Sequence, residues 1–160
     1  GYHTVYIMGS DALAEEFGEL GITVSDQAEV VIVGYDMAFD YQKLTDALQV
    51  ALQADKIIAC NKEHHYPGEN AKRMPGCGAM VGALEGSLGR AVDYSVGKPN
   101  PLLMEIICRD NQLKPEEITV IGDTYESDIV MAQQYGSNAV FIGDEKYEGT
   151  KCVSAIRELL

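Results

Sequence analysis

Short apolar runs alternate with amphipathic stretches along the chain, and turn residues separate them. Residues 30–33 form a continuous apolar run, which is typical of a strand buried on both faces of a sheet. Within residues 41–54, Leu44, Leu48 and Leu52 recur at every fourth position and give a helix one apolar face. The alternation of such strands and helices predicts an α/β fold, built from βαβ units around a mainly parallel sheet.

The predicted elements follow one another with short connections. Strands are expected at residues 4–7, 30–33, 56–60, 92–96, 118–121 and 139–142. Helices are expected at residues 11–20, 41–54, 78–88, 100–110, 128–135 and 151–160. Ser10 and Asp40 precede the first two helices, and both are residue types that cap a helix N-terminus. Residues 61–75 show no clear period and are predicted to form a loop, and a boundary between two lobes is expected near residues 89–97.

The charge balance narrows the range of partners. Twelve Lys and Arg residues against 25 Asp and Glu residues give a net charge of −13. A field of this sign repels polyanions, so nucleic acid and anionic membranes are disfavoured, and a phosphorylated substrate must be held by a local site. The chain has no apolar run near the ~20 residues that span a bilayer, and its four cysteines form no CxxC pair. A cytoplasmic protein with free thiols is therefore expected.

The segment GDTYESD, residues 122–128, carries the clearest functional signal. Asp123 would project from the carboxyl end of a predicted strand, where ligands bind in open α/β sheets, and Asp128 opens the next helix. Such carboxylates supply the oxygen ligands that Mg²⁺ prefers. The alternative is that Asp123 only begins a turn and Asp128 only caps a helix, because Gly-Asp turns are common. Tyr125 and Ser127, between the two acids, either line a pocket or are surface residues of the turn.

A lysine upstream favours the metal and phosphate site over a simple turn and helix cap. Lys98 lies in the segment VGKPNP, immediately before a helix that proline can initiate. An ammonium group at this place could balance both a phosphoryl group and a carboxylate cluster. Taken alone, such a lysine is most often a solvated surface residue. Together with the downstream acids, Lys98 favours a phosphate site.

Two motifs and a longer series of segments resemble a known family. GKPNP is similar to the third motif of the haloacid-dehalogenase-like (HAD) superfamily, and GDTYESD is similar to the fourth. Upstream, TVYIMGS, VVIVGYDMAFDYQKL, IIACNKEHHYP and PGCGAMVGALE resemble the α/β cap of the NagD and p-nitrophenylphosphatase branch. The resemblance covers residues 5–142. It implies an α/β cap lobe at residues 1–90 and, at residues 91–160, the C-terminal half of a HAD-like Rossmannoid core.

The resemblance also implies roles for single residues in a Mg²⁺-dependent phosphatase that acts on a small phosphorylated metabolite. Lys98 matches the lysine that contacts phosphate and nucleophile, Asp123 the carboxylate that binds Mg²⁺, and Asp128 the supporting acid. Asn61 and Glu63 match a cap loop that reaches over the active site and binds substrate, with an ordinary solvated loop as an equal alternative. A homodimer through the cap is a further implication.

The sequence departs from the family at its first two motifs. In the family, an aspartate of a DxD motif that precedes the cap attacks phosphorus, and the second aspartate acts as general acid and base. No DxD pair occurs in residues 1–160, so this chain alone is expected to be inactive. It would be a fragment of a phosphatase, one of two chains that pair, or a natural degenerate protein. The rival function is a non-catalytic binding or assembly module.

Two structural expectations follow from the same departure. Without the strands that precede the cap, the strand at residues 118–121 loses a neighbour and becomes an exposed apolar edge. In addition, FIGDEKYEG, residues 141–149, stands where the branch usually has a Thr-Gly turn, so the resemblance assigns no contacts to substrate at this place.

Overall fold

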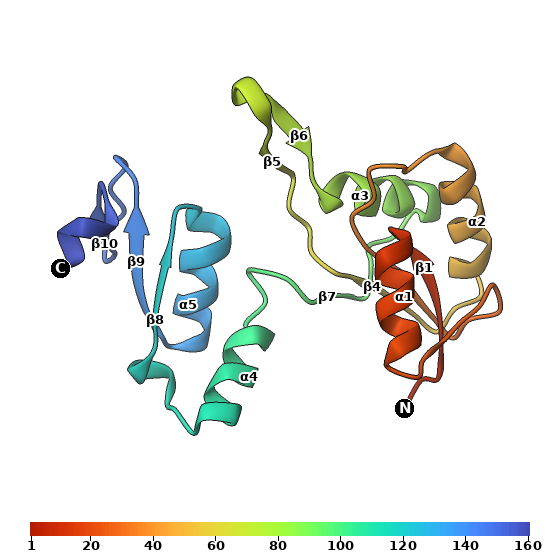
Figure 1. Ribbon diagram of the computed structural model, residues 1–160, viewed down its shortest axis with the longest axis horizontal. Coiled ribbons are helices and arrows are strands. Elements are labelled where there is room, and N and C mark those ends of the chain that lie inside the picture. Colours follow the sequence, from red (N-terminus) through yellow and green to blue (C-terminus); the bar gives the residue numbers. More distant parts are fainter. The chain divides into compact units, whose positions relative to one another are not determined.

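The computed structural model describes residues 1–160, apart from the side chain of residue 71, and divides the chain into two compact units, Gly1–Val96 and Gly97–Leu160 (Figure 1). Each unit has a parallel sheet with helices packed against it, which confirms the predicted α/β class. The division falls between Val96 and Gly97, so Lys98 is the second residue of the second unit. The assignment of residues 1–90 as a cap and 91–160 as half of a core stays a prediction.

The first unit is a five-stranded parallel sheet in the order β2-β1-β3-β4-β7. Along the chain, α1 follows β1, α2 follows β3, and α3 comes immediately before β7. The bounds are β1 (Thr4–Met8), α1 (Asp11–Glu19), β2 (Thr23–Val24), β3 (Val30–Val33), α2 (Tyr41–Ala51), β4 (Lys56–Ala59), α3 (Cys77–Leu88) and β7 (Tyr94–Ser95). The short strand β2 is absent from the sequence-based prediction, because two exposed residues carry no periodic signal.

Strand β3 lies in the centre of this sheet, and all four of its residues are buried. Val31 and Val33 belong to the core that β3 shares with α2 and α3. Val30 and Ile32 point to the opposite face, where residues of α1 such as Phe17 cover them. Since successive residues of a strand face opposite sides, the continuous apolar run at residues 30–33 is required by a sheet covered on both faces.

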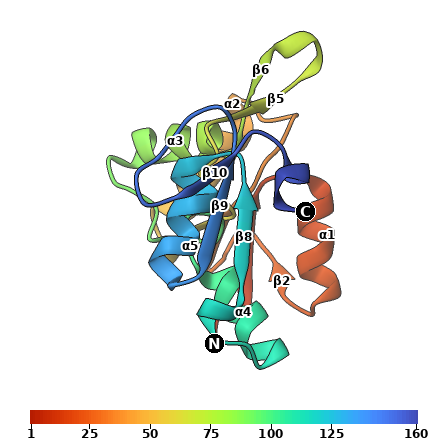
Figure 2. The same cartoon turned by 90° about the vertical axis from the view of Figure 1, so that its left-hand side faces the viewer.

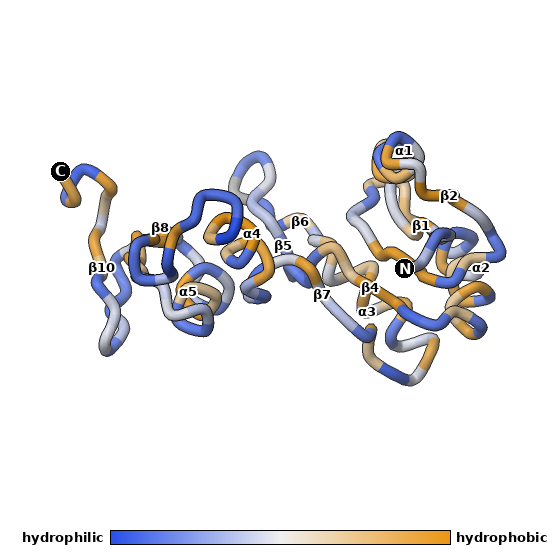
Figure 3. The backbone as a smooth tube through the Cα atoms, turned by 90° about the horizontal axis from the view of Figure 1, so that it is seen from below, coloured by the Kyte–Doolittle hydropathy of each residue, from blue (hydrophilic) through white to orange (hydrophobic). Residues whose placement is uncertain are grey.

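The first two helices begin where the sequence predicts. The Ser10 hydroxyl accepts a hydrogen bond from the Leu13 N–H at 3.4 Å, and the Asp40 carboxylate accepts one from the Lys43 N–H at 2.8 Å. Both caps are confirmed. Figure 3 shows hydrophobic and hydrophilic residues mixed along α1 and α2, as expected for helices with one buried face. In the described residues, no helix is long and apolar enough to cross a membrane.

The predicted loop at residues 61–75 is partly wrong. It contains a two-stranded antiparallel hairpin, β5 (His65–Pro67) and β6 (Arg73–Pro75), which projects from the rest of its unit (Figure 1). The Tyr66 hydroxyl shares a hydrogen bond of 2.6 Å with the Tyr35 hydroxyl, and the two rings meet edge to face. This contact anchors the hairpin, and local periodicity cannot reveal it because Tyr35 is distant in sequence.

The second unit is a three-stranded parallel sheet in the order β10-β9-β8. Helix α5 packs along β9, and α4 contacts α5 (Figure 2). The bounds are α4 (Leu102–Asn111), β8 (Thr119–Gly122), a π-helical turn (Tyr125–Ile129), α5 (Val130–Tyr135), β9 (Asn138–Ile142) and β10 (Lys151–Val153). The predicted helix at residues 128–135 therefore starts earlier, as a π-turn.

Two further expectations for this unit have opposite outcomes. The predicted helix at residues 151–160 is wrong, because Cys152 and Val153 pair with β9 as part of β10, and only a short 3₁₀ turn, Ile156–Leu159, follows. The expected edge is confirmed for the described residues, since β8 pairs with β9 alone. Ile121 of β8 is 44% exposed, which is high for an apolar residue of a parallel sheet.

Glutamate 85 gives a test of the first unit's stability. Its Oε1 accepts hydrogen bonds from Lys62 Nζ at 2.7 Å and from the Val92 N–H at 2.9 Å, and these donors lower the pKa of Glu85 below its ordinary value of 4.5. An acidic group whose pKa is lower in the folded state stabilises the fold at pH values above its ordinary pKa. This stabilisation is lost as the pH falls through the pKa of the folded state. We predict that Glu85→Gln lowers the free energy of unfolding at pH 7 by about 1 kcal/mol.

The difference between Glu85→Gln and the parent should shrink as the pH is lowered below 4.5, because protonated Glu resembles Gln. Urea unfolding at pH 7 and pH 3.5 measures both quantities. Glu15→Gln, an exposed residue of α1, is the matched control and should leave both values unchanged. A difference that stays constant with pH would contradict the prediction.

Candidate functional site

Asp123 lies at the carboxyl end of β8, immediately after Gly122. Its side chain is exposed, and among the described residues it has no hydrogen bond or ion pair. The carboxyl ends of parallel strands are the usual place for ligands in α/β sheets. A free carboxylate at this place is available to a cation from outside the protein.

Asp128 is held in the opposite way. It is only 7% exposed, its Oδ1 accepts a hydrogen bond from Lys98 Nζ at 2.5 Å, and its Oδ2 accepts one from the Thr124 N–H at 3.2 Å. Both carboxylate oxygens are therefore occupied by donors of the protein itself. The geometry separates two tasks: Asp128 holds Lys98 and the turn, and Asp123 is left free for a ligand.

The π-turn explains how two acids five residues apart serve one site. The Asp128 N–H donates to the Thr124 carbonyl at 2.8 Å at the start of this turn, and the Asp128 carboxylate lies beside Gly122 at the end of β8. Space for that carboxylate exists only because residue 122 is glycine. A Cβ at Gly122 would lie 2.3 Å from Asp128 Oδ2, closer than any real contact. The sequence indicates Asp123 and Asp128, but the roles of Gly122 and Thr124 become visible only in the structure, with the Gly-Asp pair as the one local signal.

Lys98 reaches Asp128 from the segment before α4. The Lys98–Pro99 peptide bond is cis, and α4 begins shortly after, where the Leu102 N–H donates to Asn100 Oδ1 at 3.0 Å. The Lys98 side chain remains 46% exposed although its ammonium binds Asp128. An ammonium group has three N–H donors, so Lys98 can bind an anion and Asp128 at the same time.

Asn61 and Glu63 form a turn in the first unit, after β4. Asn61 Oδ1 accepts a hydrogen bond from the Glu63 N–H at 3.0 Å, and the Glu63 carbonyl accepts one from the Gly78 N–H at 2.8 Å. A Cβ at Gly76 would lie 2.3 Å from that carbonyl, so glycine is needed here for close packing. The turn is well built, but it belongs to a different unit from Lys98. A role of Asn61 and Glu63 in substrate binding stays a prediction.

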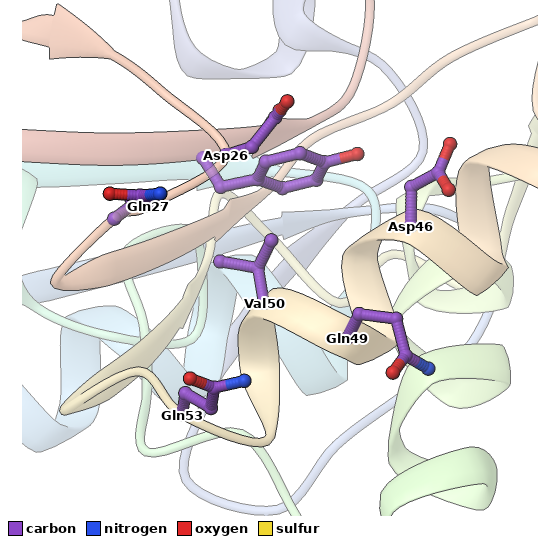
Figure 4. A pocket seen from close by; sticks show the side chains of 8 residues that line it. Asp26, Gln27, Asp46, Gln49, Val50 and Gln53 are labelled. Atoms are coloured by element: carbon purple, nitrogen blue, oxygen red, sulfur yellow. The ribbon is translucent and has the colours of Figure 1, made fainter.

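A groove of about 770 Å³ in the first unit is a different kind of surface (Figure 4). Asp26, Asp46 and Tyr6 are among the residues that line it, and the pKa of Tyr6 is raised by burial and by the charges of Asp46 and Asp26. A negatively charged lining repels phosphate. None of the residues that sequence analysis selected lines this groove, so it is not the predicted phosphate site.

The carboxylates of the second unit fit part of the coordination shell of a Mg²⁺ ion. Within the described residues, no group of three or more His, Cys, Asp or Glu side chains could hold a metal ion by itself. Magnesium is usually bound by one or two carboxylates, with water and substrate phosphate as the remaining ligands. The exposed carboxylate of Asp123 fits one such position, whereas each oxygen of Asp128 already accepts one hydrogen bond, from Lys98 or from the Thr124 N–H.

The chain is similar in sequence and in structure to known phosphatases. A family model described as HAD-hydrolase-like matches residues 95–158. The sugar-phosphatase AraL of Bacillus subtilis is 30% identical over 144 residues, which cover 88% of this chain and 53% of AraL. The structure of a p-nitrophenyl phosphatase from Archaeoglobus fulgidus has 26% identity and a TM-score of 0.81, over 98% of this chain and 59% of that chain.

A third relative was solved with a divalent cation. The glycerol phosphate phosphatase from Mycobacterium tuberculosis, in complex with calcium, has 27% identity and a TM-score of 0.77, over 90% of this chain and 43% of that chain. The present chain thus spans about half the length of the curated relatives that it matches.

The fold, the Lys98–Asp128 pair and these matches define the chain as a member of the haloacid-dehalogenase-like (HAD) superfamily of hydrolases. Within it, the chain belongs to the branch of NagD-like and p-nitrophenylphosphatase-like proteins.

A substitution at Gly122 tests whether the Asp128 carboxylate needs the space beside this glycine. We predict that Gly122→Ala forces the Asp128 carboxylate away from the Thr124 N–H and from Lys98, because the new Cβ overlaps its position. Loss of these charge-assisted hydrogen bonds should lower the free energy of unfolding of the second unit by about 2 kcal/mol, measured by urea unfolding.

Gly82→Ala is the matched control, because a Cβ there meets open space in α3. It should raise the stability of its own unit by about 0.5–1 kcal/mol. Equal stabilities for Gly122→Ala and the parent would contradict the prediction.

Proposed function

We propose that this chain is the part of a HAD-type phosphatase that holds Mg²⁺ and phosphate, in an enzyme that hydrolyses a small phosphorylated metabolite. The observation that carries the proposal is the division of work between the two acids. Asp128 binds Lys98 at 2.5 Å, whereas Asp123 beside it is exposed and unpaired among the described residues. A purely structural ion pair would not require a second, unpaired carboxylate at the carboxyl end of a strand.

Each residue of the site then has a chemical task. Lys98 is oriented by Asp128 and donates a hydrogen bond to a phosphoryl oxygen, which stabilises the negative charge on that group. Asp123 contributes one oxygen ligand to the cation. The bound Mg²⁺ would neutralise phosphoryl oxygens, as in other phosphoryl transfer sites. Asp128 stays paired with Lys98 and fixes its direction, so the ammonium does not have to be ordered when substrate arrives.

The nucleophile is the part that these residues do not supply. No aspartate is followed by another two residues later anywhere in residues 1–160, so the DxD motif of the family has no counterpart. We therefore infer that the reaction needs a carboxylate from outside these 160 residues. Alone, the chain binds the cation and phosphate but does not form the aspartyl-phosphate intermediate of the family.

The class of substrate is inferred from charge and from relatives. The net charge of −13 disfavours polyanionic substrates, and the matched relatives include a sugar phosphatase and a glycerol phosphate phosphatase. A small phosphomonoester is the substrate class that both observations favour. The turn at Asn61 and Glu63 is our candidate for the contact with its leaving group. A cytoplasmic location and a homodimer through residues 1–90 stay predictions from the sequence.

A non-catalytic binding or assembly module is the second candidate function. The exposed edge of β8 and the missing DxD pair favour it, because an unpaired parallel strand is suited to pairing with another chain. This module has no need of a cation at Asp123. Cation binding therefore discriminates between the two candidates.

Manganese, a paramagnetic substitute for magnesium, provides the direct test of the site. We predict that substoichiometric Mn²⁺ broadens the amide NMR signals of residues 122–128 selectively, and that Asp123→Asn weakens this effect at least about tenfold through loss of a charged ligand. Asp55→Asn, an exposed carboxylate of the first unit, is the matched control and should leave the broadening unchanged. Uniform broadening, or none, would favour the binding module.

Catalysis by the isolated chain is tested separately. With p-nitrophenyl phosphate and Mg²⁺, the 160-residue chain should turn over below roughly 0.1 s⁻¹, which is under the common enzymatic range. Selective Mn²⁺ broadening in the same preparation serves as the control that the site is folded. Faster turnover would show that another residue of this chain acts as nucleophile, and our account of the missing carboxylate would be wrong.

A further inference from the structure

The loop between β9 and β10 departs from the family pattern and begins at the same sheet edge as the candidate site. Strands β8 and β9 are parallel neighbours, with Gly122 opposite Phe141. The residues that follow each strand therefore emerge side by side. After β8 comes Asp123, and after β9 comes the loop at residues 143–150, which carries Tyr147.

The Tyr147 ring lies against the turn that connects the two acids. It stacks on Tyr125 with ring centroids 3.9 Å apart and planes 20° from parallel. It also meets Phe141 of β9 edge to face, with centroids 4.9 Å apart and planes at 79°. Tyr125 is the first residue of the π-turn, so Tyr147 joins that turn to the neighbouring strand.

The course of the loop favours this contact. A Cβ at Gly143 would lie 2.6 Å from the Phe141 ring, so glycine lets the chain turn closely over that ring. The Tyr147 hydroxyl donates a hydrogen bond to the Glu145 carboxylate, and this bond is the main reason that the pKa of Tyr147 rises to about 12. The hydroxyl thus keeps its proton, and the loop its internal bond, throughout the neutral pH range.

The π-turn needs support from outside itself. Turns of this type are rare and are frequently found at functional sites. No side chain caps the N-terminus of this one, and the residue before it, Thr124, contributes its backbone to Asp128. The turn also packs against β8, β9 and α5. The stack on Tyr147 adds a contact from the loop that follows β9.

We propose that Tyr147 is a positioning residue, whose stack on Tyr125 and Phe141 holds the π-turn so that Asp123 stays exposed and Asp128 stays bound to Lys98. The assignment of Mg²⁺ and phosphate as ligands of this site rests on the proposed function. The contact of Tyr147 with Tyr125 and Phe141, which we call the clamp, is a property of this chain alone. Tyr147 does not touch phosphate in this account. It acts through the backbone of the turn.

Hydrogen exchange at two amides measures the clamp without any ligand. The Thr124 N–H and the Asp128 N–H are both hydrogen-bonded in the turn. Tyr147→Ala should speed exchange at both by about tenfold, which is the size expected for the loss of two aromatic contacts. Tyr147→Phe keeps the ring and should stay within about twofold of the parent. Tyr41→Ala, an exposed tyrosine of the first unit, is the control and should change neither amide.

Exchange in β9 separates positioning from a general structural role. The amides of Ala139 and Val140 should keep their rates in Tyr147→Ala. Faster exchange across the whole second unit would overturn the proposal, as would unchanged rates at Thr124 and Asp128, or failure of Tyr147→Phe to restore them. With Mn²⁺, Tyr147→Ala should weaken selective broadening by about tenfold if the turn sets the site. A parent chain without Mn²⁺ broadening, but with a Tyr147-dependent turn, would reject the proposed function and leave the clamp standing.

Discussion

The carboxylate of Asp128 is the constraint on which the candidate site depends. It is buried, and it joins two segments 30 residues apart, because one oxygen binds Lys98 and the other binds the Thr124 N–H. A buried charge without such partners would be strongly unfavourable. The turn, the glycine that makes room for it and the orientation of Lys98 all serve to satisfy this one group. Asp123 can remain exposed because Asp128 already fixes the local geometry.

The two units differ in how completely their sheets are covered. In the first unit, helices cover both faces of a five-stranded sheet, and the buried apolar runs give it a complete core. In the second unit, three strands leave β8 at an edge with Ile121 half exposed. An apolar parallel strand in this situation is an aggregation liability or a pairing surface. In the described residues, the unpaired edge of β8 therefore lies in the same unit as the candidate site.

Aromatic contacts fix the position of two segments that show no hydrophobic periodicity in the sequence. Tyr66 ties the β5–β6 hairpin to Tyr35, and Tyr147 ties the loop after β9 to Tyr125. Both segments are polar and irregular in sequence. Each is fixed by a ring that packs against a residue from another element, which gives geometric precision to loops that have little apolar surface of their own.

The sequence by itself determined the α/β class, the order of most elements and the caps at Ser10 and Asp40, and it selected Lys98, Asp123 and Asp128 as candidate site residues. These features depend on local periodicity, capping chemistry and short motifs, which a linear sequence displays. Only the tertiary structure decided that Asp128 rather than Asp123 binds Lys98, that residues 151–153 form a strand, and that residues 65–75 form a hairpin. Those outcomes depend on which distant group supplies a hydrogen bond or a neighbouring strand, and no local pattern contains that information.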